Sequence, residues 1–155
     1  MINHRKPLGI WFFGLSGSGK TFASKNCAKS INNSFIIDGD EVRELISFDL
    51  GYSMSERKIQ LRRVLGLAQL AKNNGTFPIV STVTMTLEIL HKCSEIGIEV
   101  IQIIRPVEQI EEVRKIYQTE QNVVGKDIQQ EELNTTKLYN NGCSEFEDAV
   151  TKYVK

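Results

Sequence analysis

The sequence is short of the residues that build cross-linked or metal-stabilised folds. It has 3 cysteines and 2 histidines in 155 residues, and Cys27, Cys93 and Cys143 lie far apart without forming a C-x-x-C pair. Such an odd, scattered set argues against a disulfide framework or a zinc site, and we expect three thiols in a reducing compartment. A chain of this length buries roughly 70% of its unfolded surface and folds without such cross-links.

An excess of charge of one sign and long apolar runs are also missing. The 19 basic and 19 acidic residues cancel at pH 7, so we expect no nucleic-acid or membrane partner, although a local anion site remains open. No apolar stretch approaches the ~18 residues of a membrane span. With 3 prolines and no linker or repeat, the composition predicts a single domain over residues 1–155. We expect it in the cytoplasm, and the sequence permits a homodimer without requiring one.

Short apolar runs alternate along the chain with longer segments of helical periodicity. Runs that are nearly all apolar are typical of parallel strands covered on both faces, and right-handed crossovers then give a doubly wound, three-layer α/β domain with about five strands. We expect Ser55 to cap the longest helix and Gly97 to close another. The expected strands are 8–13, 34–37, 77–83, 98–104 and a weaker one at 133–136, and the expected helices are 21–31, 41–47, 55–72, 87–96, 107–117 and 144–154.

The first expected strand leads directly into the run GLSGSGKT at residues 14–21. This run satisfies G-x-x-x-x-G-K-[ST] in the strand–loop–helix setting of a phosphate-binding loop. Its three glycines are expected to allow positive φ and to leave no Cβ, so that backbone N–H groups curl around a phosphate at the N-terminus of the following helix. Lys20 would span the β- and γ-phosphates of ATP, and the Thr21 hydroxyl would bind Mg²⁺. The predicted ATP-binding residues of the loop are Gly14, Ser16, Gly17, Ser18, Gly19, Lys20 and Thr21. The alternative is a turn rich in glycine and serine that merely begins a helix.

Two aspartates, Asp38 and Asp40, follow the second expected strand. In extended chain they would face the same way, at the sheet edge where this class of fold collects ligands. One carboxylate would hold the water shell of the metal, and the other would accept a proton from an attacking hydroxyl. The plainer alternative is a turn in which Asp40 caps the next helix.

The long helix carries Arg57, Lys58, Arg62 and Arg63, which are all expected to lie off its apolar stripe. Such a group is most often a solvated face, but beside a phosphate-bearing substrate Arg62 or Arg63 would clamp an anion. Tyr52, ahead of this helix, would pack in the core or stack on a base. The sequence has no [NT]KxD element and no aspartate at the end of the third strand. These absences favour a small kinase over a regulatory NTPase.

Taken together, these elements resemble the adenylyl-sulfate kinase family. The resemblance rests on GLSGSGKT, IIDGDEVR and DLGYS, on an Arg-Arg pair ten and eleven residues after Tyr52, and on residues 122–127. It covers roughly residues 9–128. It implies a P-loop kinase fold with a lid segment, and a phosphotransferase that uses an alcohol group as acceptor. With Mg²⁺, the enzyme would transfer the γ-phosphate of ATP to the ribose 3′-hydroxyl of adenosine 5′-phosphosulfate (APS).

Carried over position by position, the resemblance implies three groups of site residues. Catalysis would use Lys20, Asp38 and Asp40. Arg114 would contact ATP from a lid over residues 114–126, which would close to exclude water. The acceptor would be bound by Asp40, Arg43, Tyr52 (in place of a base-stacking phenylalanine), Arg62, Arg63, Ser81 and Lys126.

The sequence departs from this family on the acceptor side, whereas the ATP side is intact. Glu44 and Leu45 stand where the family usually has His and Gly, Phe48 replaces an arginine, and residues 82–85 read TVTM instead of F-I-S-P. Two acceptors therefore stay open, APS and cytidine diphosphoramidate, the second being a substrate of relatives in bacterial capsule modification. Two other interpretations are a non-catalytic ATP-binding switch protein and a nucleoside or nucleoside-monophosphate kinase.

Overall fold

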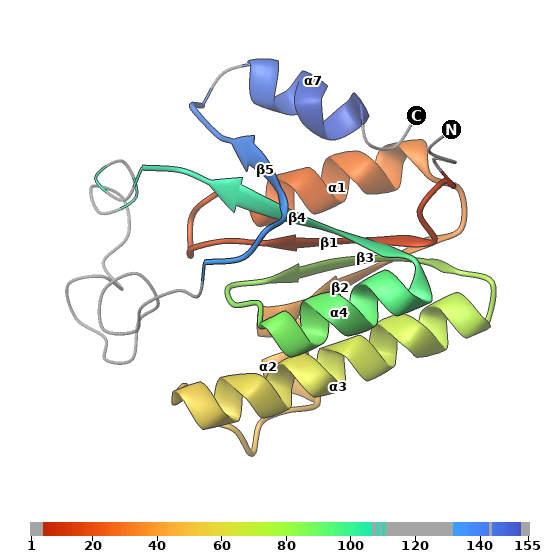
Figure 1. The fold of residues 1–155 in the computed structure, drawn as a ribbon, viewed down its shortest axis with the longest axis vertical. Helices are drawn as coiled ribbons and strands as arrows, with labels where there is room; N and C mark the ends of the chain where they lie inside the picture. The colour runs from red at the N-terminus through yellow and green to blue at the C-terminus, as the bar shows by residue number, and fades with distance from the viewer. Residues whose placement is uncertain (1–4, 107, 109, 111–131, 143, 153–155) are drawn as a thin grey trace.

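The computed structural model describes residues 5–106, 108, 110, 132–142 and 144–152. In this part of the chain five parallel strands form one sheet in the order β2-β3-β1-β4-β5, with helices on both faces (Figure 1). The expected doubly wound α/β fold is thereby confirmed. The strands are β1 (Gly9–Phe13), β2 (Ser34–Asp38), β3 (Phe77–Thr82), β4 (Ile98–Ile104) and β5 (Thr136–Tyr139), and the helices are α1 (Lys20–Ser30), α2 (Gly39–Leu45), α3 (Met54–Asn73), α4 (Leu87–Ile96) and α7 (Ser144–Lys152).

Some expected features lie outside the described residues. These are the lid at 114–126 with Arg114 and Lys126, the run 122–127, and most of the helix expected at 107–117. Among the residues described, none of the helices combines the length and apolar character needed to cross a bilayer.

The central strand β1 separates two apolar layers. Successive side chains of a strand point to opposite faces of the sheet. Trp11 and Phe13 therefore pack in one cluster with α3 and α4, whereas Ile10 and Phe12 pack in the other with α1 and α7. All four side chains are fully buried. Figure 1 shows the same arrangement, with α1 and α7 on one side of the sheet and α2, α3 and α4 on the other.

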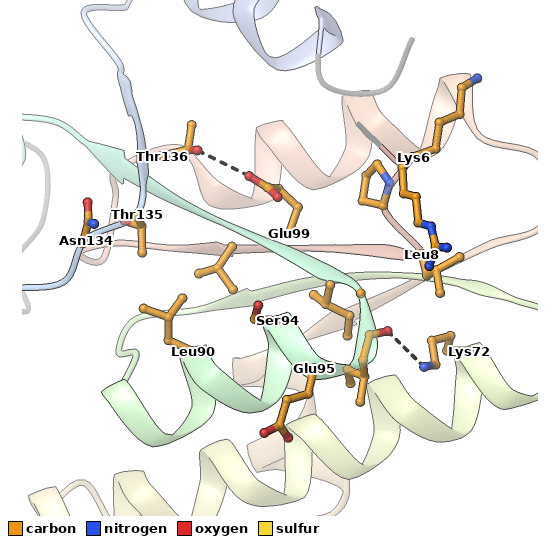
Figure 2. Close-up of a pocket in the computed structure, with 16 residues that line it drawn as sticks. Lys6, Leu8, Lys72, Leu90, Ser94, Glu95, Glu99, Asn134, Thr135 and Thr136 are labelled. Carbon is orange, nitrogen blue, oxygen red and sulfur yellow. Dashed lines mark hydrogen bonds between the residues drawn. The ribbon is translucent and has the colours of Figure 1, made fainter. Parts of the chain in front are cut away.

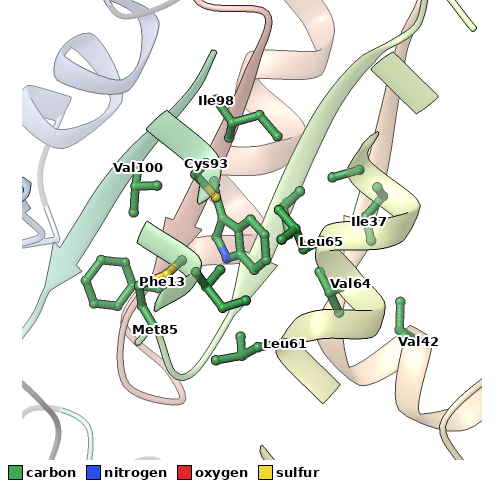
Figure 3. Packing of buried hydrophobic residues seen from close by; sticks show 14 of the residues in the cluster. Phe13, Ile37, Val42, Leu61, Val64, Leu65, Met85, Cys93, Ile98 and Val100 are labelled. Atoms are coloured by element: carbon green, nitrogen blue, oxygen red, sulfur yellow. The ribbon is translucent and has the colours of Figure 1, made fainter. Parts of the chain in front are cut away.

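The apolar layer beside α3 also contains a hydrogen bond that holds the end of β3. Figure 3 shows Phe13 and Met85 packing near Leu61 of α3. Within this layer the indole N–H of Trp11 donates a 2.8 Å hydrogen bond to the Thr82 hydroxyl, which donates in turn to the Thr84 carbonyl at 2.7 Å. A buried indole N–H needs such a partner. The bond ties β1 to the carboxyl end of β3, where the candidate site lies.

Helix α3 starts earlier than expected, and its cap is Ser53 instead of Ser55. The Ser53 hydroxyl accepts the Glu56 N–H at 3.4 Å, and the Glu56 carboxylate accepts the Ser53 N–H at 3.2 Å. This reciprocal pair is a capping box, which satisfies two N–H groups at once and therefore prevails over a single cap. Ser55 lies in the first turn. At the other end of its helix, Gly97 closes α4 with a φ of 81°, as expected.

The last strand, β5, lies three residues beyond its expected start. It pairs with the second half of β4, from Ile101↔Thr136 to Ile104↔Tyr139. Leu133, the apolar residue that suggested an earlier start, is instead buried in the layer beside α3. The placement at 133–136 is therefore wrong, because the register with β4 decides where this short strand lies.

Candidate active site

The carboxyl ends of the five strands bring the glycine loop and several polar or charged residues to one edge of the sheet. β1 leads into the loop at residues 14–20, β2 ends at Asp38, and β3 carries Ser81 next to its last residue. Arg105 follows β4, and Asn140 follows β5. Ligands of open parallel sheets bind at this edge. We therefore take it as the candidate active site.

The glycines of the loop serve two different purposes. Gly17 and Gly19 have positive φ angles of 83° and 110°, as expected. Gly14 does not, so the expectation of positive φ is wrong there. Its role is to leave space, because a Cβ at Gly14 would collide with the carbonyl oxygen of Ile103.

Lys20 is the first residue of α1 and folds back over the loop. Its ammonium group donates to the carbonyls of Gly14 at 2.8 Å and Leu15 at 2.9 Å. The helix begins after Gly19, with no side-chain cap and no acidic residue in its first turn. The partial positive charge of the helix N-terminus is thus directed at the loop without competition from a carboxylate. This arrangement suits a bound anion such as a polyphosphate.

The oxygen groups at this edge suit a magnesium ion that arrives with a phosphate. Thr21 and Asp40 are exposed residues, and Asp38, two residues before Asp40, is half-buried. Within the described ranges, no three His, Cys, Asp or Glu residues form a metal-binding group. Mg²⁺ prefers oxygen ligands and is usually held by one or two protein groups plus substrate phosphates, so these residues fit it without a dedicated cage.

Asp38, instead of Asp40, caps the helix that follows β2. One oxygen of Asp38, Oδ1, accepts the backbone N–H groups of Asp40 at 2.9 Å and Glu41 at 3.4 Å. The other, Oδ2, accepts the Ser81 hydroxyl at 3.1 Å. Because the chain enters α2 at Gly39, Asp40 lies in the first helical turn. The expectation that both carboxylates project from extended chain is wrong, as is the alternative that Asp40 is the cap.

Tyr52 stands outside the core, with 52% of its surface exposed, so the expectation of core packing is wrong. The guanidinium carbons of Arg43 and Arg57 lie 4.4 and 5.4 Å from the centre of its ring. Arg43 also donates to the Gly51 carbonyl at 2.7 Å, and Arg57 donates to the Tyr52 carbonyl at 2.9 Å. We call Arg43, Tyr52 and Arg57 the tyrosine cluster. It presents a partly exposed aromatic ring with two cations close to it, an arrangement that suits a ligand with an aromatic part and an anionic part.

Arg57 was expected on a solvated face but is only 8% exposed. Its burial, together with the positive charge of Arg43, lowers the pKa of its guanidinium. Gln60, one turn further along α3, is also buried, and its amide donates to the Gly39 carbonyl at 3.0 Å. Neither Arg57 nor Gln60 was predicted to belong to the site. Their spacing of three, continued at Val64, places them on a buried face and could have identified them.

Arg62 and Arg63 are held by carboxylates of this chain. Arg62 pairs with Glu88 of α4 at 3.1 Å, and Lys92 reaches the same carboxylate at 3.1 Å. Hydrogen bonding to these two cations lowers the pKa of Glu88 to about 2. The Arg63 guanidinium donates bidentate hydrogen bonds to the two carboxylate oxygens of Asp49, at 2.6 and 2.8 Å. The acceptor-binding roles expected of this Arg-Arg pair stay predictions.

A hollow of about 1070 Å³ lies elsewhere, beside the amino end of β4 (Figure 2). It is bordered by residues 5–8, by α4 and by residues 134–136. At its rim Lys72 donates to the Ile96 carbonyl at 3.0 Å, and Thr136 donates to Glu99 at 3.3 Å. None of the residues predicted for the site lines this hollow. The chemistry of the described residues therefore points to the loop edge.

Sequence comparison relates the chain to one family of kinases. The family profile described as adenylylsulphate kinase matches residues 6–104. The adenylyl-sulfate kinase of Staphylococcus haemolyticus is 36% identical over 86 residues, which is 53% of this chain and 43% of that protein. The bifunctional enzyme NodQ of Rhizobium sp. (strain N33) is 36% identical over 87 residues, covering 54% of this chain and 14% of that protein. The matched stretch thus spans less than half the length of either relative.

Comparison of structures extends the likeness of fold to 96% of the chain. The APS kinase of Mycobacterium tuberculosis, solved in complex with AMPPNP and APS, aligns with a TM-score of 0.83 and 22% identity over 96% of both chains. The P-loop kinase fold expected from the sequence is thereby confirmed. With the profile matching well over half of its residues, the chain belongs to the adenylylsulphate kinase family.

Proposed function

We propose that this protein is a kinase that transfers the γ-phosphate of ATP to the ribose 3′-hydroxyl of APS, with Mg²⁺ as cofactor. The observation that carries the proposal is the placement of the Lys20 loop and the Asp38–Ser81 pair at one edge of the sheet. Family membership supports it, as does the M. tuberculosis structure of the same fold, which holds an ATP analogue and APS.

On the ATP side, the loop would bind the β- and γ-phosphates through its backbone N–H groups. Lys20 would exchange its contacts with the carbonyls of Gly14 and Leu15 for charge-assisted bonds to phosphate oxygens, which are stronger. The Thr21 hydroxyl, exposed beside it, would hold Mg²⁺. When bound, this ion neutralises charge on the phosphates. Arg114, from the predicted lid, would add a further contact to ATP.

At the reacting centre, the two aspartates would have separate roles. Asp38 already accepts three hydrogen bonds, which fix its orientation. Asp40 is exposed, and among the described residues its carboxylate accepts no hydrogen bond. We therefore assign Asp40 as the base that accepts the proton of the attacking 3′-hydroxyl. Asp38 would orient the water molecules bound to the metal. Most of the rate would come from holding donor and acceptor in line.

On the acceptor side, the base would stack on Tyr52 and the anionic portion would meet Arg43 and Arg57. Both guanidinium groups already lie against the ring, so the cations are in place before the ligand arrives. Arg62 and Arg63 would first have to release Glu88 and Asp49. Ser81 would act through Asp38, and Lys126 would contribute from the predicted lid.

The test is an acceptor panel. The protein is incubated with Mg·ATP and with APS, cytidine diphosphoramidate, nucleosides, nucleoside monophosphates or no acceptor, and ADP is quantified. Phosphorus NMR then locates the new phosphate. ADP formed with APS, with phosphate on the 3′ oxygen, is the expected result. A 3′ product from cytidine diphosphoramidate alone would change the acceptor, and a product phosphorylated elsewhere would refute 3′ transfer. ATP binding without acceptor-dependent ADP would instead support an ATP-binding switch.

A further inference from the structure

Two side chains from distant parts of the chain hold the glycine loop from its outer side. The amide nitrogen of Asn140, Nδ2, donates a 2.7 Å hydrogen bond to the Ser18 carbonyl in a buried setting. The Arg105 guanidinium donates to the Gly17 carbonyl at 3.2 Å. Arg105 follows β4 and Asn140 follows β5, so both contacts come from the side of the sheet beyond β1.

The hydrogen bonds of Asn140 determine which way its side-chain amide points. Its backbone N–H donates to the Ile104 carbonyl at 2.7 Å, which fixes the residue at the end of β5. Its side-chain oxygen accepts the Gly142 N–H at 3.0 Å. Because that oxygen is already directed at a donor, the NH₂ group must be the one that faces Ser18. Asn140 is 8% exposed, so water does not compete for this bond.

The consequence for the loop follows from the geometry of the peptide group. In a trans peptide the C=O of one residue and the N–H of the next point in opposite directions, and the described chain has no cis peptide bond. Holding the Ser18 carbonyl outward therefore directs the Gly19 N–H inward. In the same way the Ser18 N–H, behind the Gly17 carbonyl, points inward and closes a turn by donating to the Leu15 carbonyl at 3.0 Å.

The hydrogen bond between Asn140 and the Ser18 carbonyl thus directs the Gly19 N–H towards the position that a ligand would occupy. Among the described residues it has no hydrogen-bond partner. The fit is close, because a Cβ at Gly19 would lie 2.5 Å from Nδ2 of Asn140. The Ser18 side chain is fully buried, so the contact acts on the backbone of the loop.

We propose that Asn140, assisted by Arg105, is a positioning residue that fixes the Gly19 N–H in the direction needed to bind a phosphate. The inference rests on the proposed function, in that the loop is taken to bind the phosphates of ATP. Asn140 itself touches the loop and not the ligand. Its removal should therefore weaken every polyphosphate ligand, whether or not the ligand carries a base.

The test compares Asn140→Leu with the parent protein. Leucine has the same branched arrangement of side-chain heavy atoms and no charge, so the change removes the hydrogen bond without adding electrostatic repulsion. Dissociation constants for Mg·ATP and for inorganic tripolyphosphate are measured by calorimetry, well below the melting temperature of each protein. We expect both ligands to bind about tenfold more weakly, the usual effect of losing one well-placed hydrogen bond. A merely structural role would lower the melting temperature and leave both dissociation constants unchanged.

Asn74→Leu is the matched control. The Asn74 amide also donates to a carbonyl, that of Leu70 at 2.8 Å, but it lies at the exposed end of α3. Its affinities should equal those of the parent. Unchanged affinities in Asn140→Leu would overturn the inference. Weaker ATP binding with unchanged tripolyphosphate binding would also overturn it, because Asn140 would then act on the adenine part of ATP and not on the phosphates. If Asn140→Leu fails to fold, Asn140→Ala is judged by the same criteria. A parent protein that binds neither ligand would refute the proposed function and this inference with it.

Discussion

The hydroxyl of Ser81 donates a 3.1 Å hydrogen bond to Oδ2 of Asp38. The two residues are partners in the register of β2 and β3, so the sheet itself brings them together. The other oxygen of Asp38 caps α2, the helix that carries Asp40 and Arg43. One carboxylate thus joins the end of a strand to the helix that carries two of the residues proposed to bind the acceptor.

Replacing Ser81 with alanine should lower kcat about tenfold while leaving KM for ATP unchanged. The reason is that Oδ2 of Asp38 loses the hydroxyl donor that holds it in place. Steady-state kinetics with saturating acceptor measure both constants. Ser24→Ala is the control, since Ser24 is equally buried but its hydroxyl has no partner among the described residues. A Ser81→Ala enzyme with the kcat of the parent would show that this hydrogen bond plays no part in catalysis.

Arg57→Met should raise KM for the acceptor about tenfold and leave KM for ATP unchanged. Methionine keeps much of the volume but removes the cation beside Tyr52 and the hydrogen bond to its carbonyl. Varying each substrate at saturating concentration of the other separates the two constants. Lys58→Met, at the exposed neighbouring position, removes the same charge and should change neither constant. Equal effects of the two variants would mean that Arg57 contributes only net charge.

The two buried thiols should be inert in the folded protein. Burial raises the pKa of Cys27 to about 11 and that of Cys93 to about 12, so neither forms appreciable thiolate at pH 8. In a Cys143→Ser variant, a chromogenic disulfide reagent at pH 8 should therefore react only after denaturant is added. Rapid reaction of the native variant would show that one of these side chains is accessible.

The Glu88 cluster should make a small, salt-sensitive contribution to acid stability. Glu88 titrates near pH 2 in the folded protein and near 4.5 ordinarily, so its contribution is complete above pH 4.5 and is lost as the pH falls towards 2. Because the cluster is exposed, the effect is small. The melting temperature of Glu88→Gln should lie slightly below that of the parent at pH 6, and the difference should vanish near pH 2 or in about 1 M salt. A difference that persists at pH 2 would exclude the ion pairs as its cause.

The sequence predicts regular elements well where local signals agree. α4 and β4 have the bounds expected of them, because Gly97 separates a helical pattern from an unbroken apolar run. β5 was misplaced because its pattern has a single buried residue, Leu138, and pairing with β4 sets its position. The cap of α3 is Ser53 and not the predicted Ser55, because only Ser53 has a glutamate three residues later that completes a capping box.

The glycine loop and the aspartates were found from the sequence because each lies in a short contiguous motif. The contacts that organise them were not found, because they join distant positions. Asn140 and Ser18 are 122 residues apart, and Arg105 and Gly17 are 88 apart. A polar residue after a short strand carries no local sign of such a partner. Arg57 was missed for another reason, since a charged residue on a helix is usually solvated, whereas this one packs against Tyr52.

The most direct test of the account is acceptor-dependent ADP formation by Lys20→Ala beside Lys25→Ala. Lys25 is an exposed lysine on the same helix, so its loss controls for charge and for helix stability. We predict that Lys20→Ala loses at least about a hundredfold in rate while Lys25→Ala matches the parent, because the Lys20 ammonium group lies over the loop that would hold the phosphates, whereas Lys25 is exposed further along the helix. A Lys20→Ala protein that forms ADP from ATP and acceptor at the parental rate would contradict the account.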